Sequence, residues 1–123
     1  MDWESHILFD VNDLFDYEPE DLAGLDRIDR RTAVRNLIGA RIRRSFGDLD
    51  DGDLLSRIEN PDVLREAAIF LNLQLVFYAN SAGGDVFARK AEMYARRFET
   101  AIREALELLD FEGLQKSGVT LIR

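Results

Sequence analysis

The most regular pattern of hydrophobic and polar positions lies between Asp85 and Asp110, a stretch without glycine or proline. Apolar residues recur there at intervals of three and four, the spacing that places them on one face of a helix. We therefore expect one long helix over residues 85–110 that packs along this face. The face consists of Phe87, Ala91, Tyr94, Phe98, Ala101, Ala105 and Leu108, widened by Ile102, Leu106 and Leu109.

A second helical stretch, from Pro61 to Asn80, is apolar around most of its circumference. Asn60 is suited to cap its start, and proline is favoured at the first helical position. A helix this apolar must be covered on nearly all sides, either by the rest of the chain or in part by a neighbouring subunit. The short loop of turn-forming residues at 80–84 predicts that this helix runs antiparallel to the one at 85–110.

A third, amphipathic helix is predicted from Leu25 to Phe46, with arginines on its polar face. Gly39 lies inside it, which favours the close approach of another helix at that point. A shorter helix is expected over residues 54–58, after a turn.

These patterns predict an all-α fold, a small antiparallel helical bundle with one long C-terminal helix and extended N- and C-terminal arms. With 123 residues, the chain is most simply one domain. The expected organisation is an acidic N-terminal arm over residues 1–24, a helical bundle domain over 25–112 and a C-terminal arm over 113–123.

Both arms carry apolar residues that need a surface to pack on. In the N-terminal arm, Ile7, Leu8, Phe9 and Val11 form an apolar run between carboxylates, so this arm lies on its own subunit or on a neighbour. The C-terminal residues 117–123 favour an extended conformation without an obvious second strand in the chain. They therefore either fray or add to a partner.

The net charge of −8 conceals two opposed blocks. Residues 1–26 contain many carboxylates and no lysine or arginine, whereas residues 27–44 contain arginines with a single aspartate. Such blocks favour ion pairing within the chain or between copies, although two solvated charged faces would give the same pattern. The residues predicted to form contacts between subunits are Asp10, Asp13, Asp16, Glu18, Arg27, Arg30, Arg31, Arg35, Arg96 and Arg97.

The residue types present argue against an enzyme. The chain has no cysteine, which excludes disulfides, thiolate nucleophiles and zinc-thiolate sites. Its only histidine, His6, lies in the acidic arm without a nucleophile and a third group arranged around it. Gly83-Gly84 lacks the spacing and the lysine of a phosphate-binding loop. We therefore predict no catalytic residues and no cofactor.

The acidic segment Asp48–Asp53 resembles the start of a calcium-binding loop, but its register fails. With Gly52 at the sixth position of such a loop, Gly47 would stand where an aspartate ligand is needed and Ile58 where a glutamate is needed. No metal site is expected there.

Sequence-specific nucleic-acid binding and membrane insertion are also disfavoured. The isoelectric point near 4.6 opposes the basic surface of nucleic-acid-binding domains. No stretch reaches the run of ~18 apolar residues that a membrane span needs, and the start MDWESH lacks the basic region of a signal peptide. We expect a cytoplasmic protein.

The order of the expected elements resembles that of a known protein family. A basic helix is followed by an acidic turn, a nearly all-apolar helix (LREAAIFLNLQLVFYAN), a Gly-Gly-Asp loop and a long helix (ARKAEMYARRFETAIREALELLD). Over approximately residues 25–113, the chain resembles the head-tail adaptor, or head-completion, proteins of tailed bacteriophages and gene transfer agents. The positions that carry the resemblance best are Gly84, Asp85, Lys90, Tyr94, Phe98, Leu109 and Asp110.

The resemblance implies a structural virion protein, a subunit of a ring that connects the portal to stopper or tail proteins. In that family the ring is dodecameric, lies in the virion neck after assembly in the host bacterial cytoplasm, and lets DNA pass without sequence-specific binding. Phe111-Glu112-Gly113 departs from the acidic Asp/Gly-rich segment that often follows the long helix in the family. The portal-binding arm would consist of Gly113, Leu114, Gln115, Lys116, Ser117, Gly118, Val119, Thr120, Leu121, Ile122 and Arg123.

A second hypothesis needs no resemblance. The chain could be a small cytoplasmic helical regulatory protein that binds a protein partner through its acidic N-terminal arm, for example as a mimic of nucleic acid.

Overall fold

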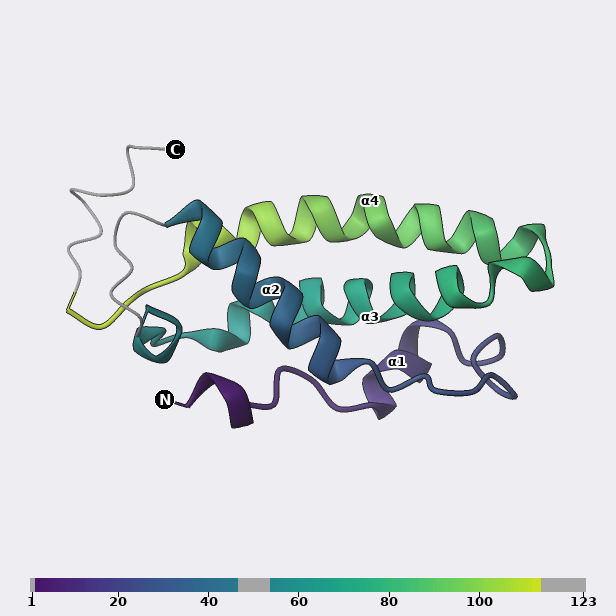
Figure 1. The fold of residues 1–123 in the computed structure, drawn as a ribbon, viewed down its shortest axis with the longest axis horizontal. Coiled ribbons are helices and arrows are strands. Elements are labelled where there is room, and N and C mark those ends of the chain that lie inside the picture. The colour runs from purple at the N-terminus through teal and green to yellow at the C-terminus, as the bar shows by residue number, and fades with distance from the viewer. Residues whose placement is uncertain (1, 47–53, 114–123) are drawn as a thin grey trace.

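Two antiparallel helices form the centre of the molecule. The computed structural model describes residues 2–46 and 54–113. α3 (Arg65–Ala79) and α4 (Asp85–Leu108) lie side by side and are joined by the short 3-10 helix η5 (Ser81–Gly83) (Figure 1). The described residues include helices and one isolated β-bridge, so the prediction of an all-α bundle is confirmed.

The other elements pack around this hairpin. α2 (Arg31–Ser45) crosses it diagonally, and the N-terminal arm, with η1 (Trp3–Ser5) and α1 (Asn12–Tyr17), runs along the side of α3 (Figure 1). Two further 3-10 helices, η3 (Leu54–Arg57) and η4 (Pro61–Leu64), lead into α3. The helix expected over residues 61–80 thus begins with a tighter 3-10 turn. The arm is less extended than expected, because it contains two short helical segments.

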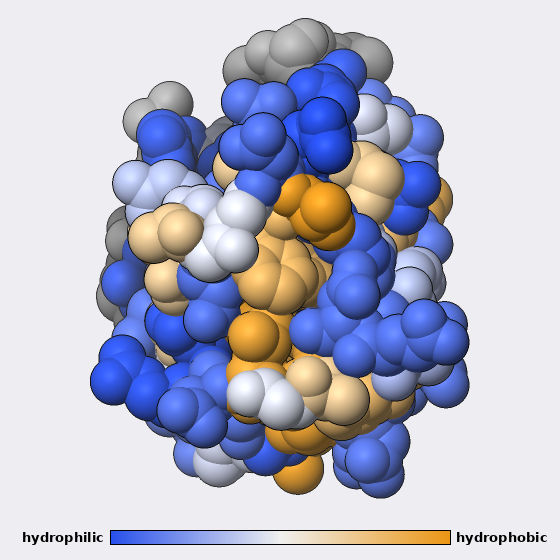
Figure 2. Space-filling model, turned by 90° about the vertical axis from the view of Figure 1, so that its right-hand side faces the viewer, coloured by the Kyte–Doolittle hydropathy of each residue, from blue (hydrophilic) through white to orange (hydrophobic). Residues whose placement is uncertain are grey.

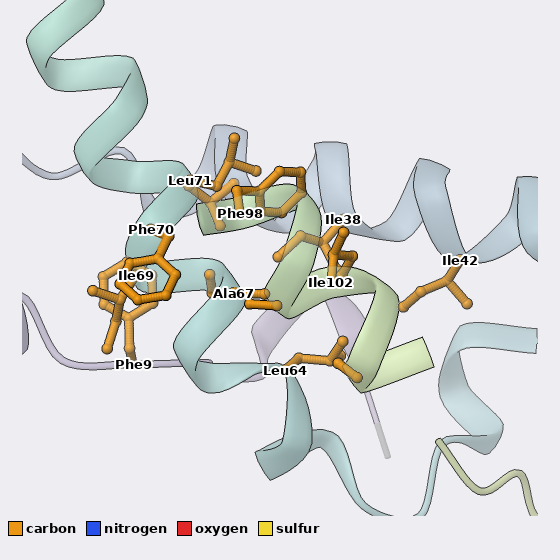
Figure 3. Packing of buried hydrophobic residues seen from close by; sticks show 14 of the residues in the cluster. Phe9, Ile38, Ile42, Leu64, Ala67, Ile69, Phe70, Leu71, Phe98 and Ile102 are labelled. Atoms are coloured by element: carbon orange, nitrogen blue, oxygen red, sulfur yellow. The ribbon is translucent and has the colours of Figure 1, made fainter. Parts of the chain in front are cut away.

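One hydrophobic core joins the arm and all four α-helices. Every residue from Ala67 to Leu73 in α3 is buried, which confirms that this helix is covered on nearly all sides, and the cover comes from the chain itself. Phe9 of the arm, Ile38 of α2 and Ile102 of α4 converge on it (Figure 3). Burial of each large side chain stabilises the fold by about 1.5 to 3 kcal/mol.

Three apolar positions expected on buried faces are exposed instead. Leu37 of α2 is 49% exposed, Tyr78 of α3 is 72% exposed and Leu108 of α4 is 57% exposed. Helical periodicity places residues on a face, but the edges of a wide apolar face are buried only where a neighbouring element reaches them.

The basic helix starts six residues later than predicted, at Arg31 instead of Leu25. The reason is a buried side chain in α3, Asn72. Its Oδ1 accepts a hydrogen bond from the Arg30 N–H at 2.9 Å, and its Nδ2 donates to the Ile28 carbonyl at 2.8 Å. These contacts satisfy the backbone of residues 28–30 outside a helix, so the segment has no need of helical hydrogen bonds.

The start of η4 and the end of α4 are tied together by Asn60. Its side chain does not cap η4 as predicted; instead Nδ2 donates to the Leu108 carbonyl and Oδ1 accepts from the Asp110 N–H, both at 2.8 Å. These bonds end α4 at Leu108, two residues before the predicted end. An isolated antiparallel bridge between Ile58 and Phe111 continues the connection.

Some predictions fall on parts of the chain that the structure does not describe, namely the turn at 48–53 and the C-terminal arm after Gly113. Within the described ranges, no helix combines the length and the apolar character that crossing a membrane requires.

Candidate subunit-contact sites

The N-terminal arm lies on its own subunit. Trp3, Phe9, Leu14 and Leu22 are all buried in the core. A Cβ atom at Gly39 would lie 3.1 Å from Trp3 Nε1, so a side chain at this position of α2 would crowd the indole. The Cβ atom would lie equally close, at 3.1 Å, to Leu55 Cδ1 of η3, so Gly39 admits two short 3-10 helices, one of them in the arm, as the sequence suggested for a close helix approach.

The first two acidic residues of the predicted contact set have local roles at the start of α1. The Asp10 N–H donates to Asp13 Oδ2 at 2.9 Å, and Asp10 Oδ1 accepts from the Asn12 N–H at 2.8 Å. Asp13 also forms an ion pair with Arg65 of α3 at 2.9 Å. Both carboxylates are therefore engaged within the subunit, and Arg65 is a partner that the sequence did not single out.

Glu18 is a buried carboxylate that binds α4. Tyr94 Oη donates to its Oε2 and Lys90 Nζ donates to its Oε1; Lys90 also pairs with Asp21. Burial disfavours the charge on Lys90, but the hydrogen bonds to Asp21 and Glu18 outweigh it and raise the pKa of Lys90. Burial and the hydrogen bond to Glu18 raise the pKa of Tyr94. At neutral pH the cluster therefore holds a charged lysine and a protonated tyrosine.

Asp16 is the one acidic member of the predicted set that is exposed and forms no hydrogen bond or ion pair within the described residues. It stands on α1, next to Tyr17, whose ring meets the Phe70 ring edge-on at 5.4 Å. This carboxylate is free to contact another molecule.

The arginines after the acidic arm pair mainly with their neighbours in sequence. Arg31 forms two side-chain hydrogen bonds to Asp29, at 3.0 and 2.9 Å, and this contact holds the pKa of Asp29 below its usual range. Arg30 Nε donates to the carbonyl of Arg27, which adopts a left-handed conformation with φ of 55°. Among the described residues, the one ion pair between the acidic arm and this block joins Glu4 and Arg35, 3.9 Å apart, and Asp10 also attracts Arg31 electrostatically.

Arg96 and Arg97 border a groove of about 380 Å³ between α3 and α4. The Arg97 guanidinium lies 5.4 Å from the centre of the Tyr94 ring and 6.0 Å from that of Phe70, a cation–π arrangement. Neither arginine forms an ion pair with another described residue. The remaining lining residues are Glu66, Phe70, Met93, Thr100, Ala101 and Glu104.

The C-terminal arm leaves the bundle from a fixed point. Besides the Asn60 contacts, the Glu59 N–H donates to the Asp110 carbonyl at 2.9 Å and the Glu112 N–H donates to the Arg57 carbonyl at 2.7 Å. Gly113 follows with φ of 82°, a left-handed conformation that glycine adopts readily. The backbone is therefore held up to the first residue of the predicted portal-binding arm. Residues 114–123 lie outside the described part of the chain.

The opposite end of the molecule carries exposed apolar surface. Figure 2 looks at this end, where α3 passes into α4, and shows a strip of apolar residues bordered by hydrophilic ones. Val86, the second residue of α4, is 52% exposed there. The sequence pattern did not mark this end, because Val86 lies outside the regular apolar face of the helix.

Among the described residues, no group of three or more histidine, aspartate and glutamate side chains is placed to hold a metal ion. The features that stand out are thus contact surfaces. Comparison with family models, curated proteins and solved structures found no match to this chain.

Proposed function

We propose that the chain is a subunit of a ring-shaped head-tail adaptor, which binds the portal at one end and a stopper or tail protein at the other. The resemblance of residues 25–113 to that family motivates the proposal. It carries with it the expectation of a homo-oligomeric ring, dodecameric in the family, through which DNA passes in the virion neck.

The observation that supports the proposal best is the separation of two contact features by α4. At its C-terminal end, the hydrogen bonds of Asn60 fix the point where the arm of residues 113–123 begins. At its N-terminal end lie the exposed side chain of Val86 and the apolar strip seen in Figure 2. A helix of 24 residues separates the two by about 36 Å. A connector needs two distant contact ends of this kind.

Charged side chains without a partner in the subunit also support assembly of several copies into a ring. Asp16 on α1, and Arg96 and Arg97 on α4, have no ion-pair partner among the described residues. Contacts between subunits of a ring are heterologous, so they join two different surfaces of the same chain. The free carboxylate of Asp16 and the arginines of α4 offer charges of opposite sign to a neighbouring copy.

The test mixes the purified chain with portal and measures particle mass. We expect ring-sized complexes on the portal. A variant that ends at Gly113 should keep its helical circular dichroism signal, because described residues from Trp3 to Phe111 already form one continuous hydrophobic core, but it should fail to attach. Continued attachment of this variant would contradict the role of the arm. A chain that never associates with portal would contradict the proposal as a whole.

The regulatory alternative predicts a different result. A regulator would bind its partner through the acidic arm, and replacing the exposed Glu20 with glutamine and Asp26 with asparagine should abolish binding. In the adaptor hypothesis, the same variant still attaches to portal through residues 113–123.

A further inference from the structure

A cavity of about 240 Å³ lies between the N-terminal arm and the first turns of α2. Residues 5–9 of the arm form one wall, and side chains between positions 29 and 35 form the other (Figure 1). Trp3 and Phe9, at the two ends of this part of the arm, are buried in the core. Both walls of the cavity are therefore held in place by the fold.

The side chain of Arg35 lines the cavity and carries a hydrogen-bond donor that the subunit does not use. This side chain is 19% exposed, and its Nε atom is buried and has no hydrogen-bond partner among the described residues. Its ion-pair partner Glu4 is exposed and lies 3.9 Å from a terminal guanidinium nitrogen, which is beyond hydrogen-bond distance. Because buried donors are normally satisfied, this one indicates an acceptor from outside the chain.

The other charged side chains that line the cavity are paired with each other. Arg31 donates two hydrogen bonds to Asp29, at 3.0 and 2.9 Å, so their charges largely cancel. Arg35 therefore carries the charge that no hydrogen-bonded partner balances. A ligand with one negative charge suits it better than one with two, because the carboxylates of Asp29 and Glu4 repel a dianion more strongly.

The cavity also has apolar walls. Ile7 lines it and is 69% exposed, and Leu8 next to it is partly buried against the core. Covering an exposed isoleucine with an apolar group is favourable, because apolar surface is removed from water. The cavity thus offers a positively charged donor and an apolar surface to the same ligand.

We propose that this cavity binds a carboxylate that carries a short apolar chain. The carboxylate accepts two parallel hydrogen bonds from Arg35, at Nε and at one terminal nitrogen, as the Asp29 carboxylate does from Arg31. The apolar chain lies against Ile7 and Leu8. Such a carboxylate belongs either to a small organic acid or to the C-terminal residue of a peptide. The adaptor proposal assigns nothing to this cavity, so the inference goes beyond it and does not depend on it.

The experiment is an NMR titration of the isotopically labelled full chain that follows the Nε–H resonance of Arg35. Butyrate and N-acetyl-leucine are the probes, and ionic strength is kept constant because salt screens charges. We expect a saturable shift with a dissociation constant of about 1 mM, typical of a small ligand with few contacts. Butyramide and N-acetyl-leucinamide lack the charge and should bind at least about tenfold more weakly. Tighter binding of N-acetyl-leucine than of butyrate identifies a peptide C-terminus as the source, and the reverse order identifies a small acid.

Two variants test the site, with binding followed at the backbone amide of Thr32, which also lines the cavity. Arg35→Lys keeps the charge but lacks the two parallel donors, so it should weaken binding at least about tenfold. Arg43→Lys is the matched control, because Arg43 is exposed on the same helix, and it should bind like the original chain. Ile7→Glu places a repelling carboxylate at an exposed position, where the fold tolerates it, and should also abolish binding.

Circular dichroism checks that each variant retains its helices. A shift that does not saturate, equal binding of acid and amide, or unchanged binding in both Arg35→Lys and Ile7→Glu would overturn the proposal and assign the Arg35 Nε to water. Portal attachment is measured separately, so failure of one proposal leaves the other standing.

Discussion

Two connections hold the N-terminal third of the chain on the hairpin, and they use opposite chemistry. Asn72, a neutral amide in α3, binds the Arg30 N–H and the Ile28 carbonyl. Glu18, a carboxylate in the arm, binds Lys90 and Tyr94 of α4. Both polar side chains are buried, and both bind several partners.

The difference lies in how each connection depends on its partners. The amide donates one hydrogen bond and accepts another, so it meets the needs of two backbone groups without any charge. The carboxylate only accepts, so it needs donors, and its main donor is a lysine that must itself stay charged. The amide connection should therefore be insensitive to pH, whereas the carboxylate connection should weaken when Lys90 or Tyr94 loses its proton.

The largest expected effect is that of Asn72→Ala. It leaves the part-buried Arg30 N–H and Ile28 carbonyl without partners, and an unsatisfied buried group costs about 1 to 3 kcal/mol. We expect the free energy of unfolding to fall by about 3 kcal/mol in urea denaturation, and exchange of the Arg30 amide hydrogen to accelerate. Asn36→Ala, at an exposed position of α2, is the control and should stay within about 0.5 kcal/mol. A loss for Asn72→Ala as small as that of the control would contradict this role of the amide.

Glu18→Gln should have the second largest effect. The variant keeps an oxygen acceptor but loses the charge that strengthens both hydrogen bonds, and charge-assisted bonds contribute about 1.5 to 3 kcal/mol. Because Lys90 keeps Asp21 as a partner, we expect a loss of about 2 kcal/mol in urea denaturation. Glu20→Gln is the control. Glu20 lies two residues further along the arm and is exposed, so its replacement should leave the free energy of unfolding nearly unchanged. Equal stability of the two variants would show that the charge of Glu18 contributes nothing.

The same cluster predicts a dependence on alkaline pH. The pKa values of Lys90 and Tyr94 are both raised in the folded state. The unfolded chain has a pKa of about 10 for both groups, and below that pH their full contribution to the stability of the fold is present. Because the pKa values are higher in the folded state, this contribution is lost as pH rises from the unfolded pKa through the folded one. Urea denaturation between pH 7 and about 11 should show this loss, and a Lys90→Met/Tyr94→Phe variant should show a flatter profile. An unchanged profile in that variant would assign the alkaline loss to other groups.

The sequence was sufficient for the helices and their pairing because their signals are local. The apolar repeat after Asp85 and the short loop before it predicted α4, its antiparallel partner and the all-α class. The start of α2 could not be predicted in this way. Residues 28–30 are held by Asn72, more than 40 positions along the chain. No local pattern distinguishes an asparagine in an apolar helix that will capture a distant backbone from one at the surface.

The contact residues were harder to predict for the same reason. The sequence paired the acidic arm with the arginines that follow it, whereas the fold brings Asp13 to Arg65 and Glu18 to Lys90. Composition indicated that the acidic arm and the arginine-rich segment after it carry opposite charges. Which basic residue each carboxylate of the arm pairs with depends on which helix faces the arm in the fold. Likewise, the exposure of Leu37 follows from how far α2 extends over the hairpin, which periodicity does not determine.

The smallest expected effect on the free energy of unfolding comes from the ion pair between Arg41 and Glu99. This pair lies at the surface, whereas the carboxylate of Glu18 is buried. The hydrogen bond from Arg41 holds the pKa of Glu99 below its usual range. Such a pair contributes at pH values above the ordinary glutamate pKa and loses its contribution as pH falls below it. Half of the Glu99 side chain is exposed, so solvent and salt screen the pair and its contribution should stay below about 1 kcal/mol. A double-mutant cycle with Arg41→Met and Glu99→Gln measures it, at low and at high salt. If its coupling energy equalled that of a Glu18–Lys90 cycle, burial would not be what distinguishes the arm connection from a surface ion pair.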